Sequence, residues 1–155
     1  MTCKTTPVNH AEVTSSLTKL SNDQVHAYAV YCAAAEAIRK TMLPVEVRSE
    51  PRRYRLKVGG RLVQVFGKRS DEWQLSDALK PLAPDTDAVV FVDLEGEHPE
   101  FYPVPADWFR HDVERRYTEY LARVGTRPKN PDSRHYAVPP SHVVRWWDKW
   151  DVFSG

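Results

Sequence analysis

The chain has 155 residues, of which 41% are hydrophobic and 28% are charged, and its formal net charge at neutral pH is +1. This length and composition are typical of one soluble domain with a core of its own. No apolar run approaches the roughly 18 residues that cross a membrane, and the first residues lack the apolar core of a signal peptide. We therefore expect no membrane partner and a bacterial-type cytoplasmic location.

The sequence lacks the short motifs that mark the common catalytic and metal-binding classes. Its two cysteines, Cys3 and Cys32, give neither a disulfide framework nor a CxxC pair. HExxH, GxSxG and GxxxxGK[ST] are also missing. These observations argue against zinc, serine-hydrolase and phosphate-loop chemistry, and we expect no cofactor.

The near-neutral total conceals two neighbouring segments of opposite charge. Residues 39–69 hold ten Lys or Arg and two acids, whereas residues 71–107 hold ten acids and one Lys. Such segregation indicates a charged partner, either a nucleic acid or a protein. The alternative is that the two segments fold against each other and neutralise their charges.

Residues 1–20 are rich in Thr and Ser and have no periodicity, so we predict a mobile tail before a single domain at 21–155. The first helix should begin after Ser21, because Ser21 and Gln24 have the spacing of a capping box. Apolar residues then recur at the helical period until Pro44 ends the element.

Next come a short alternating strand at 45–50 and the most basic stretch of the chain, residues 53–69. In that stretch Gly59-Gly60 predicts a hairpin with a two-residue turn, which fixes the register of the two strands. One face of the hairpin is then apolar and meets the core, and the other is basic. The register predicts three pairs on the basic face: Lys57 with Leu62, Arg55 with Gln64, and Arg53 with Phe66.

The second half of the chain supplies the remaining elements. Residues 87–94 are apolar on both strand faces, which predicts a central strand covered on both sides. A strand at 100–105 contains a proline and belongs at a sheet edge. A helix capped by Asp107 should run to about Val124. This element order predicts an α/β or α+β fold with a mixed central sheet of about five strands flanked by helices.

The last thirty residues are expected to be a loop followed by a docking segment. Several prolines between 126 and 140 predict the loop, and residues 141–147 predict a short helix. We expect the C-terminal aromatic tail to pack onto the core. Its members are Trp146, Trp147, Trp150 and Phe153.

Two stretches carry a resemblance to a known family. VGGRLVQVFGKRSDEWQL (58–75) is similar to a family strand that follows a Gly turn, and AVVFVDLEGEHPEFYPVPADWF (88–109) is similar to a family segment of strand, turn and strand. Together with the helix at 22–42 and the closing Trp150-Asp151, they resemble small bacterial members of the PD-(D/E)xK nuclease superfamily. The resemblance implies the restriction-endonuclease-like fold.

In that family an Asp and a second acid on adjacent strands hold a divalent metal, and a Lys two residues after the second acid positions the attacking water. The resemblance places Arg55 at the Asp, Gln64 at the second acid and Phe66 at the Lys. It therefore implies a degenerate site without catalytic residues or a metal, and we lean against an enzyme. Only an active nuclease with a migrated site, using Glu46 or Glu50 with Lys68, would need Mg²⁺.

The best remaining clue is the basic face of the hairpin. We predict that it binds DNA, RNA or a protein, as an accessory module in defence or genome maintenance. An immunity or antitoxin-like protein that occupies a toxin is the alternative. The predicted binding residues are Arg48, Arg52, Arg53, Arg55, Lys57, Lys68 and Arg69.

Overall fold

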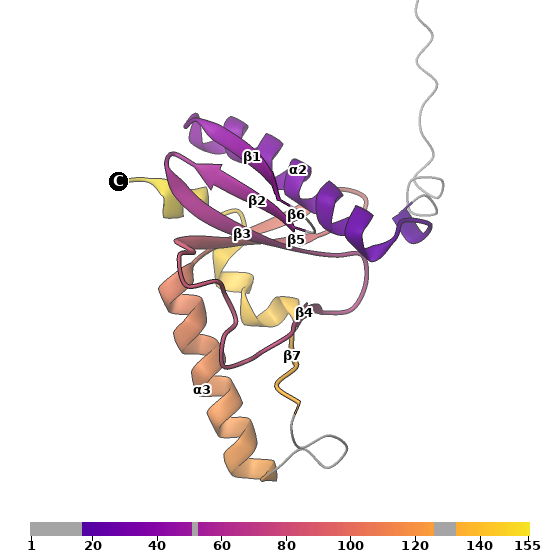
Figure 1. Ribbon diagram of the computed structural model, residues 1–155, viewed down its shortest axis with the longest axis vertical. Coiled ribbons are helices and arrows are strands. Elements are labelled where there is room, and N and C mark those ends of the chain that lie inside the picture. Colours follow the sequence, from indigo (N-terminus) through magenta and orange to yellow (C-terminus); the bar gives the residue numbers. More distant parts are fainter. Residues whose placement is uncertain (1–16, 51–52, 126–132) are drawn as a thin grey trace, which may run out of the picture.

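The computed structural model describes residues 17–50, 53–125 and 133–155 (Figure 1). In chain order the elements are α2 (Asn22–Thr41), β1 (Val45–Glu50), β2 (Arg53–Val58), β3 (Arg61–Lys68), β4 (Trp73–Leu75), β5 (Ala88–Asp93), β6 (Glu100–Pro105), α3 (Ala106–Val124), β7 (Tyr136–Val138) and the 3-10 helices η1 (Pro140–His142), η2 (Val144–Trp146) and η3 (Trp150–Phe153).

The core of the fold is a mixed five-stranded sheet in the order β1-β2-β3-β5-β6. Strands β3 and β5 are parallel, and the other neighbours are antiparallel. The chain is therefore α+β with a central sheet flanked by helices, which confirms the predicted class. Strand β6, which contains Pro103, lies at an edge as expected. The short β4 and β7, neither predicted, pair in a second, two-stranded sheet.

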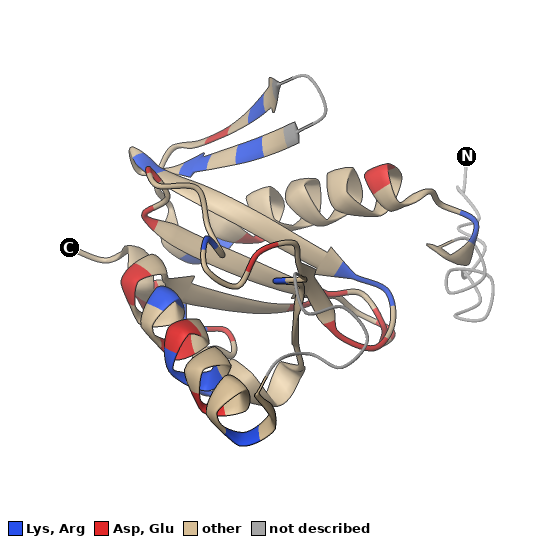
Figure 2. Cartoon of the chain, turned by 60° about the horizontal axis from the view of Figure 1, so that its bottom comes forward, with Lys and Arg blue, Asp and Glu red and all other residues tan. Residues whose placement is uncertain are grey.

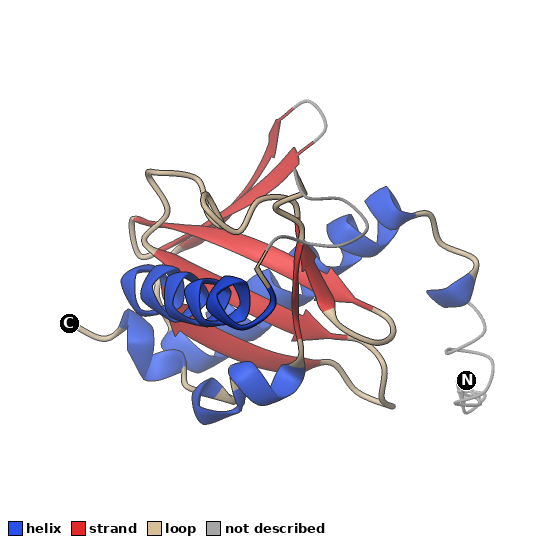
Figure 3. Cartoon of the chain, turned by 90° about the horizontal axis from the view of Figure 1, so that it is seen from below, coloured by secondary structure: helices blue, strands red, loops and turns tan. Residues whose placement is uncertain are grey.

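The two long helices cover opposite faces of the sheet (Figures 2 and 3). Strand β5 lies between them, with Val90 and Val92 in the core under α2, and Val89 and Phe91 in the core under α3. All four side chains are fully buried. The prediction of a central strand covered on both sides is confirmed.

Helix α2 begins as predicted, with both hydrogen bonds of the Ser21–Gln24 capping box. Its small residues allow a close approach to β3. A Cβ atom added at Gly67 would lie 2.5 Å from the Cβ of Ala29. Only glycine fits here, so Gly67 sets how closely α2 packs on the sheet.

Helix α3 begins two residues earlier than predicted, and its cap differs. The N-cap is Pro105, and no side chain caps the helix. The Asp107 carboxylate instead accepts a hydrogen bond from Arg110 at 3.1 Å. The prediction that Asp107 is the cap was wrong because β6 runs directly into the helix, which places Asp107 inside the first turn. The helix ends at Val124, as expected, and its C-cap Gly125 has a φ of +73°.

The aromatic tail packs on both layers. Trp150 and Phe153 are buried in the core under α2, whereas Trp146 packs against the core under α3. Trp147 is the exception, since 52% of it is exposed. The helix expected at 141–147 is two separate 3-10 turns, η1 and η2.

The predicted tail is structured at its end. Leu17 and Leu20 pack against the core under α2, and the carbonyls of both accept hydrogen bonds from Arg69. Residues 1–16 lie outside the described part of the chain. Among the helices that the structure describes, none has the length and apolarity to span a membrane.

Candidate nucleic-acid interface

The hairpin of β2 and β3 has the predicted turn and the predicted register close to it. Gly59 and Gly60 both have positive φ, and the ladder holds Val58 with Arg61, Lys57 with Leu62, and Leu56 with Val63. The ladder ends there, so the pairing of Arg55 with Gln64 was wrong. Strand β2 stays paired with β1 along its whole length instead, as far as Glu50 with Arg53. Strand β3 pairs with β5 and diverges from β2.

The divergence opens a cavity of about 260 Å³ between β2 and β3. Arg55, Gln64 and Phe66 all line it, together with His26 and Tyr54. The three positions that the family resemblance selected therefore share one cavity, although they are not cross-strand partners. Mg²⁺ prefers carboxylate oxygens, and the described residues that line the cavity contribute none. Within the described ranges there is also no group of three His, Cys, Asp or Glu that would hold a metal.

Arg55, Gln64 and Phe66 each have a structural partner. The amide oxygen of Gln64 accepts a hydrogen bond from the backbone N–H of Ala83 at 3.1 Å. Phe66 stacks on Phe91, with ring centroids 5.4 Å apart. Arg55 binds the carboxylate of Asp85 at 3.0 Å. One member of the acidic segment thus neutralises part of the basic one.

The exposed basic face lies on β1 and β2, which extend together beyond the rest of the sheet (Figure 2). Arg48 and Arg55 are direct cross-strand partners, and the next outward-facing pair is Glu46 with Lys57. Arg48 is 46% exposed and forms a long ion pair of 3.6 Å with Glu46. Arg53 lies on β2, and Arg52 lies outside the described residues. We call Arg48, Arg55 and Lys57 the hairpin cluster.

The structure separates Lys68 and Arg69 from the hairpin cluster. The Lys68 side chain is 3% exposed, and its ammonium lies 3.0 Å from Asp93 and 3.1 Å from Glu95. It also lies over the Trp73 ring, 5.2 Å from the centroid. Arg69 donates to backbone carbonyls before α2. Both cations stabilise the fold and do not extend the basic face, contrary to the prediction.

The structure also keeps Glu46 and Lys68 apart. Glu46 is in register with Lys57, and Lys57 with Leu62. Lys68 lies six positions further along β3, which is roughly 20 Å at the rise of a strand. The acids near Lys68 are Asp93 and Glu95, because the parallel ladder places Asp93 beside it. The hypothetical migrated site of Glu46 with Lys68 is therefore wrong.

A second group of polar side chains, which was not predicted from the sequence, lies on the other helical layer. Asp112 of α3 is buried and binds both Arg115 and Arg116. Arg116 then lines a cavity with Tyr120, Arg123 and residues of β7 and η1. The signal that would have found it is the spacing of positions 116, 120 and 123, which share one face of a helix.

No protein-family model, no curated protein and no solved structure matches this chain. The class that the structure itself defines is an α+β domain with a mixed five-stranded sheet between two helical layers.

Proposed function

We propose that this protein is a nucleic-acid-binding accessory module, built on a nuclease-like fold that has lost its metal site. The lost site is supported by the family resemblance of the two quoted stretches and by the lining of the β2–β3 cavity. Arg55, Gln64 and Phe66 replace the acids and the lysine that such chemistry needs, and each of them has a structural partner.

The observation that carries the binding proposal is the cross-strand pair of Arg48 with Arg55. Like charges directly opposite each other in a sheet destabilise it. Each arginine has one carboxylate partner, Glu46 for Arg48 at 3.6 Å and Asp85 for Arg55 at 3.0 Å, so the excess positive charge of the hairpin cluster comes from Lys57, which lies opposite Glu46. A phosphate backbone would relieve the repulsion and release its own counterions on binding.

The shape of the two-stranded ribbon formed by β1 and β2 favours duplex DNA. The major groove of B-DNA admits a two-stranded β-ribbon, and β1 and β2 form such a ribbon at the end of the molecule (Figure 2). Arginine and lysine side chains on this ribbon would contact phosphates and position the protein. We expect binding with little dependence on sequence.

The test is fluorescence anisotropy with a labelled duplex, a single-stranded DNA and an RNA at low salt. We expect a duplex Kd on the order of 10⁻⁵ M or tighter. The variant Arg48→Ala/Arg55→Ala should bind about tenfold more weakly. The control Arg39→Ala/Lys149→Ala removes the same charge from two exposed positions on α2 and before η3, and it should bind like the natural protein.

Three results would overturn the proposal that the protein binds nucleic acid. The first is the absence of binding to all three nucleic acids at low salt. The second is equal weakening in the control variant, which would show that overall charge and not the hairpin cluster matters. The third is purification with one protein at equal stoichiometry and without nucleic acid, which would support the immunity-like alternative. Cleavage of the duplex in the presence of Mg²⁺ or Mn²⁺ would contradict the loss of the metal site.

A further inference from the structure

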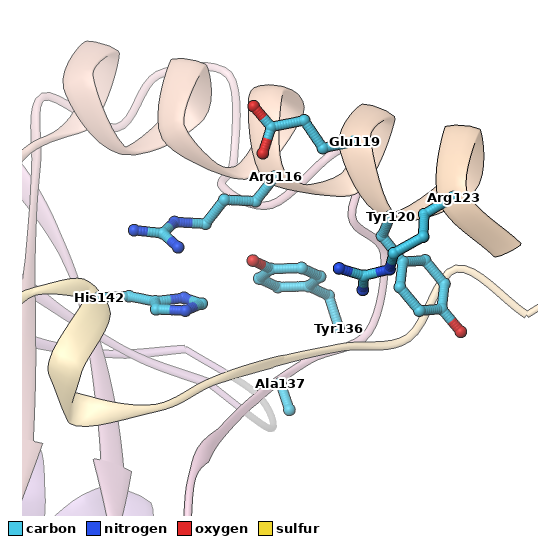
Figure 4. A pocket seen from close by; sticks show the side chains of 7 residues that line it. All are labelled: Arg116, Glu119, Tyr120, Arg123, Tyr136, Ala137 and His142. Carbon is cyan, nitrogen blue, oxygen red and sulfur yellow. The ribbon is translucent and has the colours of Figure 1, made fainter.

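A cavity of about 450 Å³ lies between the C-terminal half of α3 and the segment that holds β7 and η1 (Figure 4). This volume lies within the usual range of sites for small ligands. We call this cavity the α3 pocket. The ribbon formed by β1 and β2 lies at the opposite end of the molecule (Figure 1), so the α3 pocket is separate from the proposed nucleic-acid interface.

The walls of the α3 pocket are cationic and aromatic. Arg116, Tyr120 and Arg123 come from one face of α3, and Tyr136 and His142 come from β7 and η1. The Arg123 guanidinium lies 5.9 Å from the centre of the Tyr120 ring. Figure 4 shows both arginine side chains extending from the helix toward the segment that carries Tyr136 and His142.

Arg116 is held in place by a buried carboxylate. Asp112 is 8% exposed, and its Oδ2 accepts a hydrogen bond from Nε of Arg116 at 2.9 Å. The other oxygen, Oδ1, accepts one from Arg115 at 2.9 Å. In the described part of the chain, the two Nη atoms of Arg116 have no hydrogen-bond or ion-pair partner. A guanidinium fixed through Nε with both Nη atoms unused is arranged to bind an anion in a bidentate manner.

One acid also lines the pocket, and it has a partner. Glu119 forms an ion pair with Arg115 at 3.3 Å. Asp112 and Glu119, together with Glu72, which acts on His142, carry three negative charges, and Arg115, Arg116 and Arg123 carry three positive charges. The charges around the pocket therefore balance before His142 is counted, and the two arginines that line it supply its positive side.

We propose that the α3 pocket binds the phosphate group of a nucleotide-sized molecule. Arg116 and Arg123 bind the phosphate oxygens, and the Tyr136 hydroxyl and His142 provide further polar contacts. The rings of Tyr120 and Tyr136 offer apolar faces on which a base stacks. A nucleoside 5′-monophosphate matches this combination in charge, size and aromatic character.

The test is a titration of the full-length protein followed by NMR and calorimetry. Its probes are a nucleoside 5′-monophosphate, the unphosphorylated nucleoside and inorganic phosphate. We expect shifts of the His142 ring and Tyr136 signals with the monophosphate, weaker binding of inorganic phosphate, and none of the nucleoside. A single-stranded oligonucleotide with a 5′-phosphate distinguishes a free nucleotide from a strand end, since only a strand-end site binds it more tightly than the monophosphate.

The matched variants are Arg116→Ala and Arg115→Ala. Each removes one arginine from Asp112, but only Arg116 lines the pocket. We expect Arg116→Ala to weaken binding of the monophosphate about tenfold or more. Arg115→Ala should weaken this binding less than about threefold. Arg123→Ala serves if Arg116→Ala does not fold, because Arg123 is exposed. The hairpin variant Arg48→Ala/Arg55→Ala should leave this binding unchanged.

A second readout is the titration of His142. Burial lowers its pKa first, and Arg116 and Arg115 lower it further, while Asp112 and Glu72 act in the opposite direction. A bound phosphate adds negative charge beside the ring and should raise this pKa. Absence of any shift at about 10 mM monophosphate, a concentration well above a typical ligand Kd, would overturn the proposal. Equal weakening by Arg115→Ala would also overturn it.

Discussion

Gly67 illustrates how one residue sets the distance between two layers. A Cβ at this position would lie 2.5 Å from Ala29 Cβ and 3.6 Å from the carbonyl oxygen of Val25. Gly67→Ala should therefore lower the free energy of unfolding by about 1–3 kcal/mol through overpacking. Urea unfolding measures the change.

Gly96→Ala is the matched control for Gly67→Ala. A Cβ at Gly96 would meet only the carbonyl oxygen of His98, at 3.9 Å. Its effect should stay within about 0.5 kcal/mol. Equal losses in the two variants would contradict the packing argument, because they would then reflect the general cost of replacing glycine.

His142 should make stability depend on pH. Its pKa in the folded protein lies below the ordinary value of 6.5, mainly because the ring is buried. As the pH falls below that value, the unfolded chain binds a proton and the folded chain does not. The free energy of unfolding should therefore decrease as the pH is lowered through the unfolded-state pKa.

Urea unfolding of the natural protein and of His142→Asn at pH 7.5 and pH 5.5 tests this dependence. The natural protein should lose more stability than the variant between these two values, because only its histidine titrates. An identical loss in both proteins would show that other groups carry the pH dependence.

At the scale of the element, the start of α2 offers a direct test. The Ser21 hydroxyl accepts from the N–H of Gln24, and the Gln24 side chain accepts from the N–H of Ser21. Ser21→Ala should cost about 1 kcal/mol. A double-mutant cycle with Gln24→Ala should show coupling, since each substitution removes part of one motif. Fully additive effects would contradict a reciprocal capping box.

The elements also show where local sequence signals suffice and where they do not. The capping box, the Gly59-Gly60 turn and the pairs next to it follow from residues close together in the chain, and all are found. The predicted pairing of Arg55 with Gln64 was wrong because β2 has two neighbouring strands. Beyond Leu56 it stays paired with β1 and not with β3, and this depends on the whole sheet. The prediction that Asp107 caps α3 was wrong for a related reason, since β6 joins α3 without a connecting turn.

At the scale of the molecule, the fold class could be predicted and most of the chemistry could not. The apolar run of β5 and the proline of β6 predicted one central and one edge strand, because burial and pairing dictate those residue types. The α3 pocket was not predicted because β7 joins it only through tertiary packing. The ion pairs of Lys68 on β3 are with Asp93 of β5 and with Glu95 just after β5, so they could not be inferred locally.

The basic and acidic segments neutralise each other only in part. Arg55 with Asp85 and Lys68 with Asp93 join the basic and acidic segments, as the alternative of mutual neutralisation expects. Arg48, however, is largely exposed and faces Arg55 across the ribbon. The positive face that remains is thus narrower than the sequence indicated, and it is confined to β1 and β2.

The salt dependence of duplex binding tests the central claim most directly. The slope of log K against log salt reports how many phosphates the protein neutralises, at about 0.9 for each contact. The natural protein should show a linear decrease, and Arg48→Ala/Arg55→Ala should have a slope shallower by about 2, with the Arg39→Ala/Lys149→Ala slope unchanged. An unchanged slope in the hairpin variant would contradict the account.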